Sequence, residues 1–379
     1  MMFNWLSAPL ETLAICLVLL TAPRIGSPIR RGSSLPIAAL AVALVLTLLA
    51  TDGRLAYGVA AAAAVLHAIT AWPSTRTGAV WLAGSGLLAA GAAAGLAADQ
   101  LTAAFLLSTL AIAVRAGVLP FHAGVASLCD RAPLVQTQQL ASTVALVFVH
   151  LRFVDHHDEA IALAPIIVRF GAFACLAAAL MSTVQKDLRG FFRSTTSMHG
   201  GMVLAALGAA SLHNYAAALL VTVSASLAIG GLGTMVASLE ARVGPVVYGG
   251  TRGLAQALPR LATAFALLAA AGVAVPGSVG FVADDLLLHA LWRHSPASTV
   301  VVILSASMLA VSTLICYSHV FLGRPTAVLA PDLLPRERVV AVLLVLVILL
   351  LGFAPGGLLY PAERFLTPTE AIAGGPAGS

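Results

Sequence analysis

Charged side chains are scarce in this chain, and their scarcity excludes a soluble globular protein. Only 9% of the 379 residues are Asp, Glu, Lys or Arg, whereas 60% are hydrophobic. Soluble domains carry roughly a quarter charged residues. The apolar runs are continuous and long enough for a helix to cross a bilayer, unlike the short alternating segments of a barrel. We therefore expect an all-α, polytopic membrane protein with about 12 transmembrane helices.

The chain also lacks the patterns of enzyme active sites and of nucleic-acid binding. Its four cysteines are scattered, with no pair at metal-ligand spacing. There is no phosphate-cradling glycine loop, no CxxC pair and no nucleophile elbow. The net charge of +5 comes from arginines spread over loops. We expect no cofactor, no metal, no nucleic-acid partner and no catalytic site; the cluster from Asp155 to Glu159 is interpreted as a solvated loop.

The apolar runs predict the positions of the spans. Their expected limits are 8–23, 35–51, 55–72, 78–98, 101–128, 133–154, 160–184, 195–212, 214–239, 259–291, 297–322 and 339–360. Residues 1–366 are expected to form a single integral membrane domain. The tail at 367–379 is polar and Gly-rich, which is typical of a disordered end.

Basic residues in the loops predict the orientation. Fourteen lie in the odd-numbered connections, and only Arg54, Arg152, Arg293 and Arg364 lie in the even-numbered ones or at the C-terminus. Short cytoplasmic loops carry an excess of Lys and Arg. Both termini are therefore predicted to lie outside the cytoplasm, with the protein in a bacterial inner (cytoplasmic) membrane.

Two predicted spans are interrupted by proline, at Pro120 and at Pro276. Proline removes a helix hydrogen bond, and a membrane tolerates such a break where protein or water satisfies the freed carbonyl. Many transporters place their ion sites at broken helices. The two spans are five apart, and this odd offset predicts two inverted five-helix repeats, at about 35–154 and about 160–322. The alternative is that the helices are kinked only for packing.

Three stretches at these breaks resemble one known family. They are RAGVLPFHAGVASLCDRAP from Arg115, QKDLRGFFRSTTSMHGGM from Gln185, and AGVAVPGSVGFVADDL from Ala271. In order and separation they are similar to the antiporter-like, proton-conducting membrane subunits of NADH-quinone oxidoreductase (subunits L, M and N) and of Mrp-type antiporters. A narrower resemblance is to the membrane partner of bacterial inorganic-carbon (DAB-type) transporters, which supports a zinc-containing, carbonic-anhydrase-like subunit.

The resemblance implies a row of intramembrane groups that gain and lose a proton, and this chain keeps only part of it. Arg115 stands where the family carries a conducting lysine, but a guanidinium does not release its proton in a protein. Ala141, Ser224 and Ala228 stand where the family carries histidine or lysine. Asp284 stands where the family places its terminal lysine or glutamate.

Further ionisable residues match the motifs or lie close to them in the sequence. Asp285 follows Asp284, and His289 lies four residues further on. Isolated charges are costly in a bilayer. We therefore expect polar partners or water around Arg115, Arg169 and Asp284, and hypothesise that Asp284 pairs with Arg115 or His289. His122 and His199 are expected near the membrane edges, either as entry and exit groups or in helix caps and loop contacts.

The sequence leaves two functional hypotheses open. The first is a membrane subunit that couples proton or cation movement to a partner's activity, in inorganic-carbon uptake or a respiratory-type redox complex, through a partly degenerate proton pathway. The alternative is a non-conducting scaffold that anchors a partner subunit in the bilayer. A stand-alone solute carrier would need a polar pocket at the midplane, for which the chain offers few polar groups.

Overall fold

The computed structural model describes residues 42–43, 46–47, 50, 52–154, 158–210, 215–250, 253–324 and 330–356. These residues form helices and no strand, which confirms the expected all-α fold; one isolated bridge joins Asp187 to Val247. The helices are α3 (Gly53–Ala71), α4 (Arg76–Ala97), α5 (Leu101–Ala116), α6 (Ala123–Arg131), α7 (Pro133–Phe153), α8 (Asp158–Thr183), α9 (Leu188–Ala210), α10 (Tyr215–Val243), α11 (Leu254–Ala257), α12 (Pro259–Gly272), α13 (Val279–His294), α14 (Pro296–Phe321) and α15 (Pro335–Phe353).

Many of these helices have the length and composition of membrane spans. Within the described residues, five are long and apolar enough to cross a bilayer: α3, α4, α8, α10 and α14. Helices α5 and α12 are apolar but shorter. They are short because each ends at a break and the chain continues as a second helix, α6 or α13.

The predicted spans from the third to the twelfth all coincide with helices. One large difference is at the start of α9, predicted at residue 195 but found at Leu188. It begins earlier because the Asp187 carboxylate accepts a hydrogen bond from the Gly190 nitrogen, 2.7 Å away, and so caps the first turn. The predicted first span and tail lie outside the described residues, as does most of the second span.

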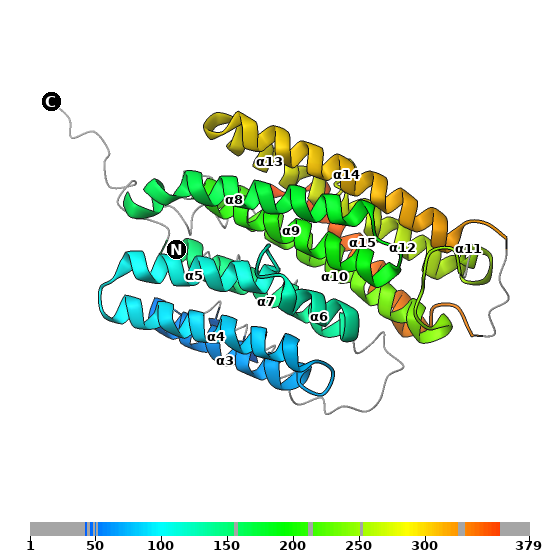
Figure 1. Ribbon diagram of the computed structural model, residues 1–379, viewed down its shortest axis with the longest axis horizontal. Coiled ribbons are helices and arrows are strands. Elements are labelled where there is room, and N and C mark those ends of the chain that lie inside the picture. Colours follow the sequence, from blue (N-terminus) through cyan, green and yellow to red (C-terminus); the bar gives the residue numbers. More distant parts are fainter. Residues whose placement is uncertain are drawn as a thin grey trace.

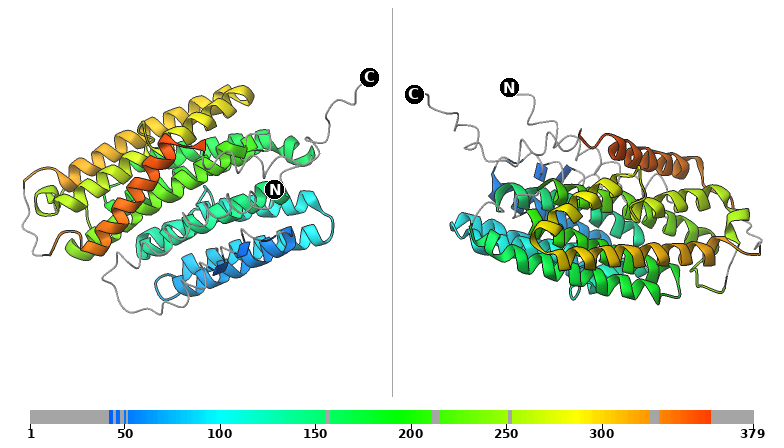
Figure 2. Two further views of the ribbon diagram at one scale, coloured as in Figure 1. Left: turned by 180° about the vertical axis from the view of Figure 1, so that it is seen from behind. Right: turned by 90° about the horizontal axis from the view of Figure 1, so that it is seen from above.

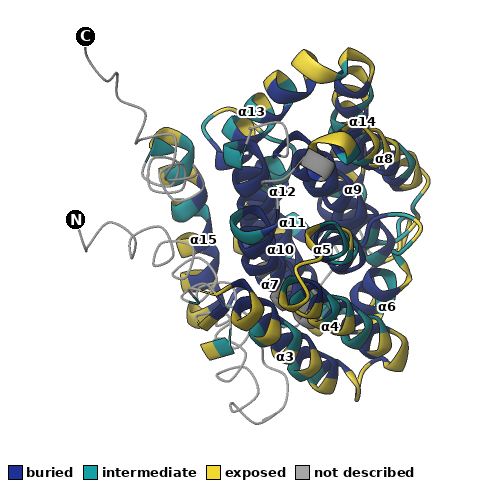
Figure 3. Cartoon of the chain, turned by 90° about the vertical axis from the view of Figure 1, so that its left-hand side faces the viewer, coloured by how far each residue is buried: buried dark blue, intermediate teal, exposed yellow. Residues whose placement is uncertain are grey.

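The helices form an elongated bundle (Figure 1). Helix α10 occupies its centre, where almost every residue is buried, while exposed residues gather at the rim (Figure 3). Helix α15 lies on the outside of the bundle (Figure 2). The burial pattern is therefore that of a membrane protein whose inner helices are surrounded by others and whose outer helices expose apolar side chains, such as Leu87 and Leu314, on the surface.

Glycines set the close approach of α8 and α9. A Cβ on Gly171 would lie 2.8 Å from the Ala205 Cα, and one on Gly201 would lie 2.6 Å from the Cys175 nitrogen. Small residues let helix backbones pack closely, and this packing is a main source of helix association in a bilayer. The pair α8 and α9 therefore forms a tight unit, with α9 on the inside.

Candidate functional site

The first break separates α5 from α6. Helix α5 ends at Ala116 because Gly117 adopts a left-handed conformation (φ 74°), in which glycine pays no steric penalty. Arg115 lies in the last turn of α5 and is only 2% exposed. Its carbonyl oxygen accepts a hydrogen bond from the side-chain amide of Gln139 on α7. The break expected at Pro120 thus exists, and a neighbouring helix satisfies a carbonyl that it frees.

The second break separates α12 from α13. Helix α12 ends at Gly272, and α13 begins after Ser278, whose hydroxyl oxygen accepts a hydrogen bond from the Phe281 nitrogen at 3.3 Å. The loop between them carries Pro276, as predicted. Asp284 lies in the second turn of α13 and is partly buried. The two interrupted helices thus place a buried cation beside one break and a carboxyl group one turn beyond the other.

Helix α9 lies against both breaks through two consecutive residues. The imidazole of His199 has Nδ1 2.9 Å from the Thr195 carbonyl oxygen and Nε2 3.0 Å from the carbonyl oxygen of Gly272, the last residue of α12. Next to it, a Cβ on Gly200 would lie 2.9 Å from the carbonyl carbon of Ala116, the last residue of α5. His199 therefore connects the two halves of the site.

The two carbonyl contacts of His199 have a chemical consequence. A neutral imidazole carries one N–H and can donate to only one of the two oxygens, whereas an imidazolium donates to both. The end of a helix also presents partial negative charge, which favours a cation. This geometry therefore suits a histidine that accepts and releases a proton. His199 is the twelfth of the 23 residues of α9 and so lies well inside the helix.

Several buried polar atoms around the first break have no hydrogen-bond partner among the described residues. They belong to α5, the break, α7 and α9, and are Thr109 Oγ1, Arg115 Nε, His122 Nδ1, Gln139 Oε1, Thr195 Oγ1 and Ser197 Oγ. A buried donor or acceptor left unpaired costs about 1–3 kcal/mol. Such groups are the usual partners of buried water. The break is therefore a polar, water-compatible region inside an apolar bundle.

His122 lies within the first break. It immediately precedes α6, inside the interruption between α5 and α6. Its ring is partly buried, and no described residue pairs with its Nδ1 atom. His122 therefore belongs to the polar region of the first break, together with Arg115.

The hypothesised pairing of Asp284 is wrong for the part of the chain that the structure describes. No ion pair joins Asp284 to Arg115 or to His289. The imidazole of His289 instead lies 3.4 Å from the exposed carboxylate of Asp285, one helical turn before it. The reason is geometric, because residues four apart share a helix face, and Asp285, not Asp284, is four residues before His289.

A row of buried, hydrogen-bonded side chains in the first half of the bundle was not predicted from the sequence. The Tyr57 hydroxyl of α3 lies 2.6 Å from the Ser108 hydroxyl of α5, which lies 2.9 Å from Nδ1 of His150 on α7. All three side chains are at most 1% exposed. A tyrosine and a histidine within apolar helices were a visible signal, but only the fold brings them together. Hydroxyl and imidazole groups in such a row can pass a proton.

The hydrogen-bonded row of Tyr57, Ser108 and His150 lies toward one identifiable end of the bundle. A Cβ on Gly53, the first residue of α3, would meet Phe153 at the end of α7 and Leu96 near the end of α4. These termini therefore meet, and we call them the Gly53 end. Ser108 is seven residues before Arg115, which places the two on one face of α5 about 10 Å apart along its axis.

Ion pairs gather at the opposite end. Arg193 of α9 pairs with Asp130 of α6 at 2.9 Å, and Arg189 pairs with Glu240 of α10 at 2.7 Å. These contacts join the end of the first interrupted span to the start of α9. They are partly exposed, so their role is mainly to orient α9 and not to conduct.

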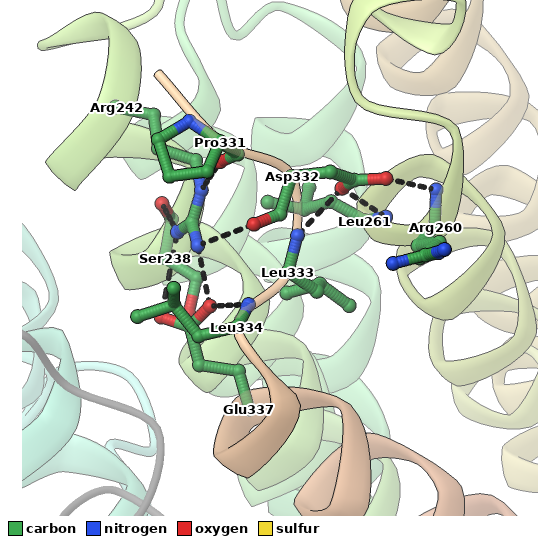
Figure 4. Close-up of polar contacts among 9 residues, drawn as sticks. All are labelled: Ser238, Arg242, Arg260, Leu261, Pro331, Asp332, Leu333, Leu334 and Glu337. Carbon is green, nitrogen blue, oxygen red and sulfur yellow. Dashed lines mark hydrogen bonds and ion pairs between the residues drawn. The ribbon is translucent and has the colours of Figure 1, made fainter.

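A buried polar cluster fixes the start of α12 (Figure 4). The guanidinium of Arg242 pairs with the Glu337 carboxylate, and their side chains are 6% and 0% exposed. The Asp332 carboxylate accepts hydrogen bonds from the backbone nitrogens of Arg260, at 2.8 Å, and Leu261, at 3.1 Å. This cluster ties α10, α12 and α15 together and so positions the second interrupted helix.

These features define a polytopic helical membrane protein with two interrupted helices that both contact α9. A family model described as "NADH:quinone oxidoreductase/Mrp antiporter, TM" matches residues 32–310, and the chain belongs to this family. The expected membership of the antiporter-like group is thereby confirmed.

Individual relatives agree with this membership. The chain is 26% identical over 257 residues to NADH-quinone oxidoreductase subunit M of Escherichia coli (strain K12), covering 65% of this chain and 50% of that subunit. It therefore spans about half the length of that relative. Among solved structures, a chain of the Mrp complex from Dietzia sp. DQ12-45-1b superposes with a TM-score of 0.78 at 18% identity, covering 98% of this chain and 84% of that chain. A chain of respiratory complex I from Thermus thermophilus gives 0.75 at 22% identity, covering 98% and 95%. These likenesses show the fold.

Proposed function

We propose that this chain is a membrane subunit that passes protons across the bilayer and couples their movement to the activity of partner proteins. The observation that carries the proposal is the position of His199. Its two ring nitrogens contact two carbonyl oxygens, one of which belongs to Gly272, the last residue of α12. A titrating group at the junction of two helix breaks is what a gated proton path needs.

The proposed path has an entry on the Gly53 end. Protons move along Tyr57, Ser108 and His150, whose polar atoms are already in hydrogen-bond contact. Water held by the unpaired atoms around the first break then carries them past Arg115 toward His199. Asp284 lies on α13, which runs from the second break toward the Gly53 end (Figure 1), so it serves as a second entry group on that side, and protons leave from His199 toward the end with Arg189 and Arg193.

Arg115 acts in this path as a fixed charge. A guanidinium keeps its proton, so Arg115 cannot take the relay role that the resemblance assigns to a lysine at this position. Its positive charge instead disfavours a second cation nearby, which controls when His199 holds its extra proton. The pathway is therefore partly degenerate, as the sequence suggests.

The partner and the orientation belong to the same proposal. The relatives are named as subunits of NADH-quinone oxidoreductase, and the segments 194–198 and 280–285 are similar to the membrane subunit of inorganic-carbon transporters. We propose a redox complex or a zinc-containing, carbonic-anhydrase-like subunit as the partner. The end with Arg189 and Arg193 faces the cytoplasm of a bacterial inner membrane, because basic loops stay inside.

A non-conducting scaffold is the second candidate. It is favoured by one specific observation, namely that the cation at the first break is an arginine and cannot exchange its proton. A scaffold would use the buried helix junction only for packing. Under this function the replacement of His199 would change stability without changing any proton movement.

The decisive experiment uses the assembly purified from its native membrane in mild detergent. The co-purifying chains are identified, and the assembly is reconstituted in vesicles that contain a pH-sensitive dye. His199→Gln, which keeps one hydrogen-bond donor but cannot take up a proton, is expected to abolish proton movement while the partner stays bound. His319→Gln, in the last turn of α14 and away from both breaks, is the matched control. Normal proton movement in His199→Gln, or none in the wild type, would establish the scaffold instead.

A further inference from the structure

Helix α8 carries an arginine in the middle of its apolar surface. Arg169 is the tenth residue of the 24-residue span Ala160–Thr183 and is exposed. Its neighbours on the outward stripe are Ile166 (62% exposed) and Phe173 (64% exposed). Nine residues separate Arg169 from the nearer end of the span, which is about 14 Å of helix.

Arg169 has no counter-charge among the residues that the structure describes. Among the described residues, no carboxylate pairs with it and its guanidinium donates no hydrogen bond. A charged side chain facing lipid at this depth is strongly unfavourable, and such residues pair with another charge or face a bundle interior. The described residues around α8 therefore do not supply the polar partner expected for Arg169.

An apolar groove lies beside Arg169. It has a volume of about 340 Å³ and lies between α5 and α8, with Leu204 of α9 also lining it. Ile166 and Phe170, the neighbours of Arg169, line one wall. The opposite wall includes Thr109, whose buried hydroxyl oxygen has no partner among the described side chains and backbone groups. The groove thus offers an apolar slot with a single polar atom.

We propose that a transmembrane helix of a different, partner protein covers α8, with a carboxylate opposite Arg169 and an apolar side chain in the groove between α5 and α8. The existence of such a partner protein rests on the proposed function, which requires a partner. The interface lies on the free face of α8, on the rim of the bundle (Figure 3).

The depth and the charge of Arg169 select this occupant over two others. A lipid phosphate lies at the headgroup level, about 15 Å from the bilayer centre, whereas Arg169 is near the middle of its span. A second copy of this chain related by a two-fold axis would bring the same surface to α8. It would place one Arg169 near another, and like charges in a medium of low dielectric repel. A carboxylate on a transmembrane helix of another protein lies at the right depth and carries the opposite charge.

The first measurement is cross-linking in the intact assembly. A photo-reactive group on Phe173→Cys, one turn from Arg169, is expected to attach to an apolar span that carries Asp or Glu within one turn of the attachment point, as read by peptide sequencing. The matched control is Val311→Cys, equally outward on α14. Attachment at position 173 only to lipid, or to a second copy of this chain, overturns the proposal.

The second measurement is partner retention. Arg169→Leu is expected to reduce the co-purified partner about tenfold, and Arg169→Lys to retain most of it, because the lysine keeps the charge. The thermal stability of the isolated Arg169→Leu chain should be unchanged or higher, since a lipid-facing charge is removed. Full retention in Arg169→Leu refutes the interface. If the wild-type assembly moves no protons but position 173 cross-links as expected, the proposed function fails and the interface stands.

Discussion

Replacing Gly200 by alanine tests the contact between α9 and the first helix break. The added Cβ would lie 2.9 Å from the carbonyl carbon of Ala116 and closer still to its oxygen. Both atoms are backbone, so no side-chain rotation relieves the clash, and α5 and α9 must move apart. The same movement would pull His199, the adjacent residue, away from its carbonyl partner on α12.

The magnitude follows from two opposing terms. Overpacking of a well-packed interior costs about 1–3 kcal/mol. Replacing glycine by alanine within a helix returns roughly 0.5–1 kcal/mol. We therefore expect Gly200→Ala to lower the free energy of unfolding by about 1–2 kcal/mol net.

Gly84→Ala is the matched control, because a Cβ on Gly84 of α4 meets nothing within 4 Å. Only the helix-propensity gain remains there, so this variant should be more stable by about 0.5–1 kcal/mol. The assay is denaturant-induced unfolding of the purified full chain in detergent. If both variants are stabilised equally, α9 does not contact the end of α5 and the site geometry is refuted.

Three further changes test the rest of the structure. Glu337→Gln leaves the buried guanidinium of Arg242 without its counter-charge and should lower the free energy of unfolding by about 3–5 kcal/mol. Its control, Asp285→Asn, removes only the exposed pair with His289 and should change the free energy of unfolding by less than about 1 kcal/mol. Equal effects of the two variants in the same unfolding assay would contradict the buried pair. Ser108→Ala interrupts the contacts with Tyr57 and His150, so proton uptake into vesicles should slow while partner binding persists. An unchanged rate of uptake would show that these three side chains are not part of the proton path. Asp284→Asn should abolish proton movement with the assembly intact, and activity that survives would favour the scaffold.

The sequence predicted the membrane architecture well because the bilayer imposes local rules. Each span must satisfy its own backbone hydrogen bonds, so an apolar run of sufficient length is a helix wherever it packs. The two breaks were equally local, since proline and left-handed glycine act on their own turn. Helices α5 and α12 end where Pro120 and Pro276 indicate, at Ala116 and Gly272.

The site was less predictable because its contacts join distant parts of the chain. His199 and Gly272 are 73 residues apart, and Tyr57 and Ser108 are 51 apart. Helical periodicity normally shows which face is buried, but here lipid and protein interior are both apolar, and the pattern does not separate them. For this reason the sequence paired Asp284 with Arg115 or His289, and neither pair forms among the described residues.

The chain's amino-acid order alone therefore determined that it crosses a membrane as helices, where most of those helices lie, and where two of them break. The tertiary structure alone decided which polar groups face one another: His199 between the two breaks, the buried chain from Tyr57 to His150, and Arg169 on the outer surface. The physical reason is that hydrogen bonding within a span is settled by neighbours in the sequence, whereas the partner of a buried polar side chain is settled by how the helices pack.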